Sequence, residues 1–397
     1  MIVYEMTKIS ANNRKSNIYA LLITLTLLLH IFNNLQLNES IKFFHLGAGL
    51  ALIFALFFLR KNLGKIEKIA LAFVTTSFFS CILSPYEQSL SVWIKLCIII
   101  GVTLFVVAIP IRKLIIGVNI IIPIVLLALV KEYFVGIYYR YQGFYEDPNY
   151  MCTTLLVLFF YLQLLWEICS KKVIRIGVLF EMLVLLFLVT TSISRTGLIC
   201  FSVMALGFFW DNFMKNKKFT IIGVLSVACL TVYFAPSLVE RAFENYTMRE
   251  TENSDTLGHA SSLRKEISMR GVNYVIDHPS CWLLGMGEGA TAHASSFPDF
   301  YVRTHHGDHN TITCCFSEQG VVGFLLMIML YYNIFKKLRS KRDSRLKKIK
   351  LISTVSLFVF IIFSMSINQM VYLPFWFMIF TLSNIAQNED SAYSLLR

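Results

Sequence analysis

The sequence is poor in charge, and its cysteines form no metal-binding or redox motif. Only 15% of the 397 residues are charged, whereas 56% are hydrophobic and the mean hydropathy is +0.63. This is more apolar surface than the core of a soluble domain needs. The nine cysteines are scattered and include no C-x-x-C pair, which argues against zinc and redox motifs alike. The composition therefore argues against a soluble enzyme and favours a chain that is solvated largely by lipid.

Apolar runs of membrane-spanning length recur along the chain. A helix needs about 20 apolar residues, at 1.5 Å per residue, to cross a bilayer. The first run has no small-residue cleavage site and others follow it, so we expect an anchor and not a removable signal peptide. The sequence thus predicts an all-α integral membrane protein of about twelve transmembrane helices. The runs are at residues 17–36, 41–59, 68–84, 90–109, 113–134, 150–168, 173–192, 195–210, 219–237, 311–335, 350–368 and 371–387.

Basic residues are concentrated in alternate gaps between these runs. Of the 36 Lys and Arg residues, 24 fall in the N-terminal segment and in five gaps: 60–68, 112–113, 171–175, 215–218 and 336–350. All of them lie on one side of the membrane if both termini are cytoplasmic, as the positive-inside rule requires. The net charge of +12 then reflects membrane orientation and implies no nucleic acid partner. We expect an inner-membrane protein with cytoplasmic termini.

One long segment, residues 238–310, is neither short nor apolar and is expected on the outer face, between the ninth and tenth helices. It separates a membrane bundle of about nine helices at 1–237 from one of about three at 311–397. Loops of this length are uncommon without a function. Apolar residues in 261–277 share one helical face, which predicts an amphipathic helix on the membrane surface, ended by the following His-Pro pair. GMGEGA at 285–290 follows no strand, so we expect a glycine-rich turn under the active site and not a nucleotide site.

Six of the eight histidines lie in this outer segment, and its densest polar group is HHGDHN, which contains His305, His306 and His309. Three interpretations stay open. The histidines and Asp308 offer zinc ligands, although adjacent side chains point apart and no partner motif follows. They also suit an ordinary solvated loop. The third interpretation is a general base, because an imidazole takes up a proton near neutral pH.

Three arginines near the outer face are candidates for binding an anion. Arg195 lies in SISRTG between two apolar runs, Arg140 follows the fifth run, and Arg264 opens the predicted loop helix. Snorkelling to the headgroups or pairing with a carboxylate would explain each of them. The alternative is that they converge on one phosphate-bearing ligand, because guanidinium groups bind phosphate oxygens bidentately.

Four motifs, in this order, resemble the bacterial O-antigen ligase and O-antigen polymerase superfamily of membrane glycosyltransferases. The resemblance covers roughly residues 138–335 and includes the position of the long outer loop. The motifs are RYQGFYEDPN at 140–149, TSISRTG at 191–197, SSLRKEISMRGVNYVIDHP with LLGMG within 261–287, and HNTITCCFSEQGVVGFLL at 309–326.

The resemblance implies an all-helical enzyme with no metal or other cofactor. It would take a glycan from an undecaprenyl diphosphate carrier at the outer leaflet. The acceptor would be lipid A core in a ligase and another carrier-linked glycan in a polymerase, and a chain-length regulator or flippase is a candidate partner. The family's two arginines map onto Arg195 and Arg264, and its histidine maps onto His309. His305 and His306 leave open which imidazole is the base.

Other polar residues of these motifs are candidates for substrate binding. Asp147 and Glu146 suit sugar hydroxyls, although Asp-Pro-Asn is equally suited to cap a helix. Glu318 lies two predicted helical turns beyond His309, where it would orient the imidazole, act as the base itself or only stabilise the helix. The predicted substrate-binding set is Arg140, Asp147, Asn149, Asn310 and Glu318.

A transporter or lipid-linked oligosaccharide flippase is the main alternative, because about twelve spans suit that class too. Transporters commonly have two similar halves and ionisable residues in mid-span. No such repeat is visible here, and most ionisable residues of the runs lie near their ends. The sequence therefore favours the glycosyltransferase, but it does not identify the acceptor, the sugar or the linkage.

Overall fold

The regular structure of this computed structural model is helical. It describes residues 2–32, 42–59, 63–136, 141–145, 147–215, 268–292, 310–339 and 347–387. The long helices are α1 (Ile2–Ile31), α2 (Phe43–Phe58), α3 (Lys65–Leu83), α4 (Ser89–Leu104), α5 (Ile111–Val135), α6 (Pro148–Ile168), α7 (Lys172–Thr191), α8 (Arg195–Lys215), α12 (Thr311–Leu338), α13 (Lys347–Ser364) and α14 (Leu373–Gln387). Shorter pieces are η1 (Phe105–Ala108), η2 (Pro279–Cys281), η3 (Ala290–Ala292) and a helix at 268–277. The predicted all-α class is confirmed for the described residues.

The predicted apolar runs coincide with these helices. Eleven of the twelve runs fall on α1 to α8 and α12 to α14, whereas the run at 219–237 lies outside the described residues. α1 begins fifteen residues before the run predicted at 17–36, because no proline or glycine in 2–16 interrupts a helix. α13 ends at Ser364, four residues before the end of the run predicted at 350–368. Beyond Ser364 the chain turns to contact other helices.

Six of the described helices are long and apolar enough to cross a membrane. They are α3, α4 with η1, α5, α6, α7 and α12, while α2 and the apolar part of α8 are shorter. These helices support a polytopic membrane protein. Twelve spans, the division into bundles at 1–237 and 311–397, the outer position of 238–310 and the orientation of the termini stay predictions.

α6 and α14 occupy the centre of the bundle. Every residue of α14 from Leu373 to Ala386 is buried, and most of α6 is buried as well. The peripheral helices expose large apolar side chains instead, such as Phe57 of α2 and Phe180 of α7. Lipid tails would solvate these faces in a bilayer, so their exposure is expected of membrane helices.

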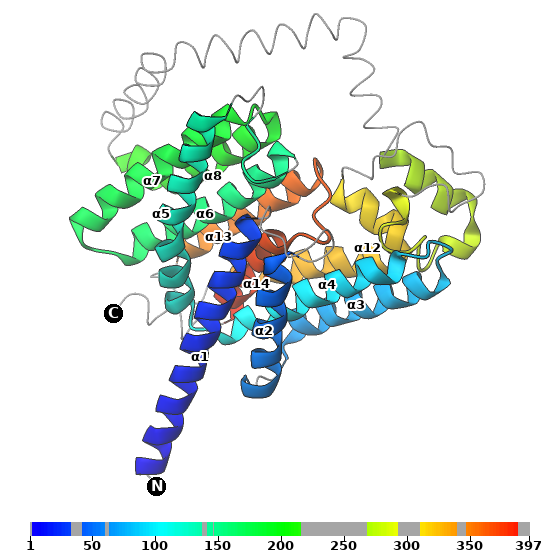
Figure 1. Ribbon diagram of the computed structural model, residues 1–397, viewed down its shortest axis with the longest axis horizontal. Helices are drawn as coiled ribbons and strands as arrows, with labels where there is room; N and C mark the ends of the chain where they lie inside the picture. The colour runs from blue at the N-terminus through cyan, green and yellow to red at the C-terminus, as the bar shows by residue number, and fades with distance from the viewer. Residues whose placement is uncertain are drawn as a thin grey trace, which may run out of the picture.

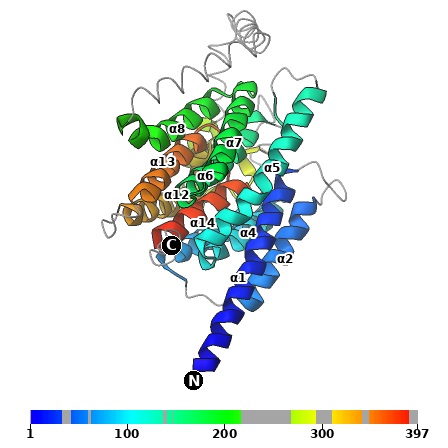
Figure 2. The ribbon, with the colours of Figure 1, turned by 90° about the vertical axis from the view of Figure 1, so that its left-hand side faces the viewer.

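The other helices surround this centre in two groups. Figure 1 shows α5, α6, α7, α8 and α13 on one side and α3, α4 and α12 on the other, with α14 between them. α12 packs along α3, and α13 packs along α8. α1 and α2 form a pair, and the N-terminal part of α1 extends beyond the other helices (Figure 2). The segment 268–292 lies at the right-hand end of the group formed by α3, α4 and α12, next to α3 and α12 (Figure 1).

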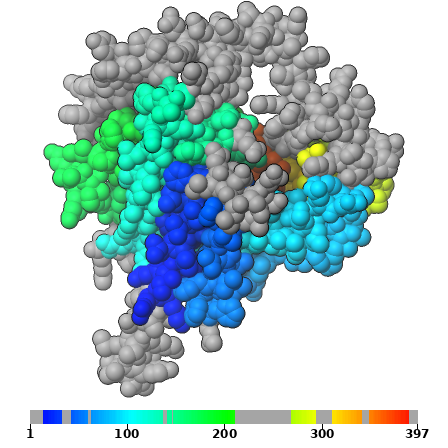
Figure 3. Space-filling view, in the orientation of Figure 1, coloured from blue at the N-terminus to red at the C-terminus, as the bar shows by residue number. Residues whose placement is uncertain are grey.

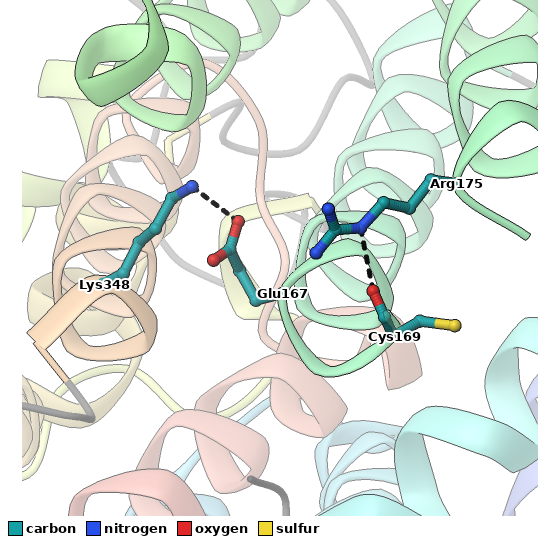
Figure 4. A network of polar contacts seen from close by, with 4 residues as sticks. All are labelled: Glu167, Cys169, Arg175 and Lys348. Carbon is teal, nitrogen blue, oxygen red and sulfur yellow. Dashed lines mark hydrogen bonds and ion pairs between the residues drawn. The ribbon is translucent and has the colours of Figure 1, made fainter. Parts of the chain in front are cut away.

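Basic residues from two separate gaps meet at one end of the bundle. Lys348 Nζ of α13 lies 2.7 Å from Glu167 Oε1 at the end of α6 (Figure 4). Arg175 Nε of α7 donates a hydrogen bond of 2.8 Å to the Cys169 carbonyl in the turn before it. Arg175 and Lys348, from two of the predicted basic gaps, therefore lie at the same end of the bundle, as the charge distribution predicts.

Candidate active site

The first part of the site is the start of α6. Asp147 is the N-cap residue, and its carboxylate accepts a hydrogen bond of 2.6 Å from the N–H of Asn149. Pro148 occupies the first helical position, where its missing N–H costs nothing. The helix-cap interpretation of Asp-Pro-Asn is thus confirmed. Asn149 is buried, with an exposed fraction of 8%. Its side chain is therefore committed to contacts within the protein.

The start of α8 is bound directly to the start of α6. Ser194 Oγ donates a hydrogen bond of 2.6 Å to Asn149 Oδ1 and accepts one of 3.1 Å from the N–H of Gly197. It therefore caps α8 while it holds the two helix starts together. Arg195, the first residue of α8, has an exposed side chain. Ile193 has a φ of 53°, a conformation that costs a β-branched residue of the order of 1–3 kcal/mol. The turn that presents Arg195 is therefore strained.

The start of α12 is the third part. Asn310 is its N-cap, and its Oδ1 accepts hydrogen bonds of 2.9 and 3.3 Å from the N–H groups of Ile312 and Thr313. Thr311 Oγ1 donates to the Ile367 carbonyl at 2.7 Å and accepts from the N–H of Gln369 at 2.9 Å. The turn between α13 and α14 thus fixes the first residues of α12.

One side chain joins this third part to the first. Gln369 Nε2 donates to Thr153 Oγ1 at 2.9 Å, one helical turn into α6 from Asn149. Tyr150 OH also donates to the Asn368 carbonyl at 2.8 Å. In Figure 3 the dark orange part of the chain, which includes the turn between α13 and α14, is visible between green-cyan and yellow segments. The starts of α6, α8 and α12 therefore meet around that turn.

Three helix starts at one place produce a positive electrostatic potential. The first turn of each helix presents N–H groups that have no partner within the helix, and the helix dipole adds a partial positive charge. The side chains of Asp147, Ser194 and Asn310 satisfy some of these N–H groups. Arg195 adds a full positive charge at the start of α8. The starts of α8 and α12 therefore favour an anionic ligand, as helix N-termini do for phosphate groups, whereas the Asp147 carboxylate opposes an anion at the start of α6.

Glu318 lies further along α12, two residues before a break in that helix. Gly320 has a φ of 67° and a ψ of −166°, a conformation essentially restricted to glycine. The break leaves two carbonyl groups before it and two N–H groups after it without helical partners. Residues 282–291, which we call the anchor turn, supply those partners. The bonds run from Met286 N to Ser317 O (2.9 Å), Gly287 N to Glu318 O (2.9 Å), Val321 N to Trp282 O (2.8 Å) and Val322 N to Leu283 O (3.3 Å).

The anchor turn is also bound through two buried carboxyl groups, whose residues have exposed fractions of 3% and 1%. Glu318 Oε1 accepts from the N–H and the hydroxyl of Thr291, at 3.3 and 2.6 Å. Glu288 Oε1 accepts from Ser77 Oγ of α3, at 2.6 Å, and from the side-chain amide of Gln319. α3, α12 and the anchor turn are therefore held together by polar contacts among buried groups.

The environment of Glu288 favours its protonated form. Burial and, second, the neighbouring carboxyl of Glu318 raise the pKa of Glu288 to about 8. The hydrogen bonds from Ser77 and Gln319 oppose this shift but are outweighed. Glu288 therefore carries a proton at neutral pH.

The structure brings together four of the predicted site residues. Arg195, Asp147, Asn149 and Asn310 belong to the three helix starts, and Glu318 lies two turns along α12, in contact with the anchor turn. The predicted loop helix is present at 268–277 and ends before His278, and the predicted glycine-rich turn is confirmed by positive φ angles at its glycines. The remaining predicted residues lie outside the described residues; they are His309, Arg264 and Arg140, together with His305, His306, Asp308 and Glu146.

The sequence analysis missed Glu288, Ser194 and Gln369. Glu288 had a signal, because a single charge inside GMGEGA is unusual in a turn that needs only small residues. Ser194 and Gln369 had none, since their contacts are with residues 45 and 216 positions away in the chain. Among the described residues, no group of three or more His, Cys, Asp or Glu side chains is arranged to hold a metal ion. Residues 305–309 lie outside the described residues, so the zinc interpretation stays a prediction.

Comparison with known proteins agrees with the motifs. No protein of curated function matches the chain. Residues 180–328 match the family described as O-antigen ligase. This stretch includes most of α7, all of α8, the anchor turn and α12 as far as Ile328. This match supports the O-antigen ligase and O-antigen polymerase superfamily that the motifs resemble.

Proposed function

We propose that this protein is a membrane glycosyltransferase of surface polysaccharide synthesis. It transfers a glycan from undecaprenyl diphosphate to a hydroxyl group of an acceptor at the outer face of the inner membrane. The acceptor is lipid A core or a second carrier-linked glycan. The observation that carries the proposal is the match of residues 180–328 to the O-antigen ligase family, which includes both Arg195 and the start of α12.

The cluster of helix starts supports a diphosphate site. As the bond between the sugar C1 and the diphosphate oxygen breaks, its electron pair moves to the diphosphate. Arg195, at the start of α8, is placed to stabilise that charge together with the helix dipoles. Arg264 of the outer segment and Arg140, just before the described residues 141–145, complete the proposed set. This charge stabilisation needs no metal ion, because guanidinium groups supply the positive charge.

His309 is the proposed general base. It directly precedes Asn310, whose side chain caps α12, and Thr311, which the turn between α13 and α14 holds in place. The acceptor oxygen attacks C1 on the face opposite the diphosphate, and its proton passes to the imidazole. One bond to C1 forms as the other breaks, so the configuration at C1 inverts. Asn149 and Asp147 support the site by holding the helix starts, and contacts with sugar hydroxyls are a second proposed role for Asp147.

A transfer assay with purified protein tests this function. The protein is placed in vesicles with a lipid-linked glycan donor and either lipid A core or a second portion of donor. Glycan attached to lipid A core supports a ligase, and lengthened carrier-linked glycan supports a polymerase. Donor that only moves between leaflets, with no new glycosidic bond, would contradict transfer and support the flippase alternative.

Substitution of Arg195 tests the diphosphate site. We expect Arg195→Ala to lower the transfer rate by about 10²- to 10³-fold, the loss typical when one donor to developing charge is removed. Arg195→Lys should retain more activity, because the charge stays and only the bidentate geometry is lost. Arg175→Ala is the matched control, since its Nε bonds a carbonyl at the other end of the bundle. Equal rates in Arg195→Ala and Arg175→Ala would remove Arg195 from the site.

Chelation tests the absence of a metal from the reaction. We expect transfer to proceed within about twofold of its normal rate after EDTA treatment, because arginines and helix dipoles carry the charge stabilisation. The rate is measured before and after chelation in the same vesicles. Loss of transfer that added zinc restores would assign the histidines of residues 305–309 to a metal site instead.

A further inference from the structure

The anchor turn divides the outer segment at a point that bears on the proposed reaction. Residues 282–291 follow the helix at 268–277, and Arg264 precedes that helix in the sequence. After the anchor turn the chain continues to His309 and Asn310. The proposed arginine and the proposed base of the outer segment are therefore separated by one structure that is fixed to α3 and α12.

Groups that are neutral near pH 7 lie close to the two carboxyl groups of this structure. The titratable groups facing Glu288 are Glu318, Cys81 of α3 and the thiols of Cys97 of α4 and Cys315 of α12. Burial and, second, the charge of Glu318 raise the pKa of Tyr86, in the turn before α4. Thiols and phenols are neutral near pH 7. Two buried carboxylates in such surroundings repel each other strongly, so the pair is stable with one proton.

The hydrogen-bond donors around the pair show where the negative charge belongs. Glu318 accepts from the N–H and hydroxyl of Thr291 and from the N–H of Gly289. Glu288 accepts from two neutral side chains, Ser77 and Gln319. Backbone N–H groups at a turn stabilise a carboxylate well. These donors favour the negative charge on Glu318 over Glu288, so the proton of the pair belongs on Glu288.

The pair is also connected to the helix starts of the site. Asn310, Cys314 and Glu318 follow one another at four-residue spacing, so they lie on one face of α12. Asn368 Nδ2 donates to Cys314 Sγ at 3.0 Å, and Cys314 also contacts Thr291 and Glu318. A displacement of the anchor turn would therefore reach the first turn of α12.

We propose that Glu288 and Glu318 are positioning residues that share one proton, lock the anchor turn into the break of α12 and thereby hold both halves of the outer segment in place for glycan transfer. This inference rests on the proposed function for its catalytic part. The lock has a pH dependence whose sign is fixed. A carboxyl whose pKa is raised in the folded protein stabilises the lock at low pH, and that contribution is lost as the pH rises through about 8.

Hydrogen exchange measures the lock without any substrate. The full-length protein is studied in lipid nanodiscs, and the exchange rates of the Met286 and Gly287 amides, which donate across the break, are divided by the intrinsic rates at each pH. In the wild type we expect this protection to fall about tenfold between pH 6 and pH 7 and to level off above about pH 8, because between the pKa of an exposed carboxyl and that of buried Glu288 only the open state has lost the proton. In Glu288→Gln the protection should change less than about threefold, because the amide cannot ionise.

Two further variants complete the exchange experiment. Glu318→Gln should lower the protection at every pH. The NH₂ group of the new amide cannot accept the hydrogen bonds that the carboxylate accepts from its donors. Glu67→Gln is the matched control, since Glu67 is a buried carboxyl of α3 bound to Gln387 near the opposite end of that helix. It should show the wild-type fall. Protection that is independent of pH in the wild type, or that falls equally in Glu288→Gln, would overturn the shared proton.

The activity of the same preparations tests the positioning role. Wild-type transfer should fall about tenfold per pH unit above pH 8, and Glu288→Gln should lack that fall while keeping the rate at pH 7 within about threefold. Protonation of the imidazole base lowers the transfer rate at acidic pH, whereas ionisation of Glu288 lowers it at alkaline pH, so the two effects are separable. An unchanged alkaline fall in Glu288→Gln would overturn the positioning role. If the wild type transfers no glycan, the proposed function and the positioning role fall together, whereas the exchange result still decides the carboxyl pair.

Discussion

Replacement of His309 by alanine is expected to lower glycan transfer by about 10²- to 10⁴-fold, the range typical of a general base. The acceptor hydroxyl is a weak nucleophile until its proton is removed, and an imidazole has the pKa needed to do this near neutral pH. His309 directly precedes the capped first turn of α12, which Asn310, Thr311 and Gln369 fix by hydrogen bonds. The measurement is the initial rate of glycan transfer in vesicles, normalised to the amount of folded protein.

A histidine from the same outer segment provides the control. The His278 ring stacks on Tyr274 at a centroid distance of 3.9 Å, and its Nδ1 lies 2.9 Å from the Tyr274 carbonyl. We expect His278→Ala to keep the transfer rate within about threefold, because that ring caps the loop helix and takes no part in the proposed reaction. Normal transfer in His309→Ala, with a large loss in His305→Ala or His306→Ala, would move the base to the residue whose loss matters. Normal transfer in all three would reject the general-base mechanism.

Replacement of Gly320 by alanine is expected to destabilise the protein by about 2–5 kcal/mol. Two effects act together. The φ of 67° and ψ of −166° at Gly320 are essentially unavailable to a residue with a side chain. An added Cβ would also lie 2.5 Å from the carbonyl carbon and oxygen of Leu283, which belong to the backbone of the anchor turn and have little room to move. The measurement is thermal or denaturant unfolding of the purified protein in detergent.

Gly177→Ala is the matched control for this stability prediction. Gly177 lies within α7, and an added Cβ would have no heavy atom within 4 Å. Alanine has a higher helix propensity than glycine by about 1 kcal/mol, so this variant should be equally or slightly more stable. A Gly320→Ala protein as stable as Gly177→Ala would contradict the break in α12 and the placement of the anchor turn within it. Gly285→Ala should resemble Gly320→Ala, since its Cβ would lie 2.4 Å from the Glu318 carbonyl carbon.

The positions of the membrane helices could be predicted from the sequence because they depend on local composition. An apolar run of about 20 residues forms a helix in lipid, since every backbone polar group must be paired within the segment. The cap of α6 could be predicted for the same reason, because Asp147 bonds the N–H of Asn149, two residues further on. Helix ends were less predictable where tertiary contacts decide them. α13 stops before Asn368 and Gln369, which turn away to bond α12 and α6.

Glu318 shows how far residue type and spacing can lead. Its place two turns along α12 was predicted, and its expected roles were to bind substrate, to orient the imidazole, to act as the base or only to stabilise the helix. In the structure Glu318 is buried, with an exposed fraction of 3%, and its carboxylate accepts a hydrogen bond from the Thr291 hydroxyl. No local pattern indicated that partner, which lies 27 residues earlier in the chain. The spacing therefore predicted the position of the carboxyl group but not its contacts.

The all-helical membrane character, the cap of α6, the glycine-rich turn and the resemblance to the O-antigen ligase family could all be inferred from residues 1–397 as a sequence, because each depends on composition or on short stretches of neighbouring residues. The meeting of the starts of α6, α8 and α12 near the turn between α13 and α14 depends instead on tertiary contacts. Tertiary contacts also decide that the anchor turn fills the break at Gly320 and that Glu288 and Glu318 form a buried pair. Those features depend on hydrogen bonds between residues from 27 to 218 positions apart, and such pairings are set by the packing of whole helices.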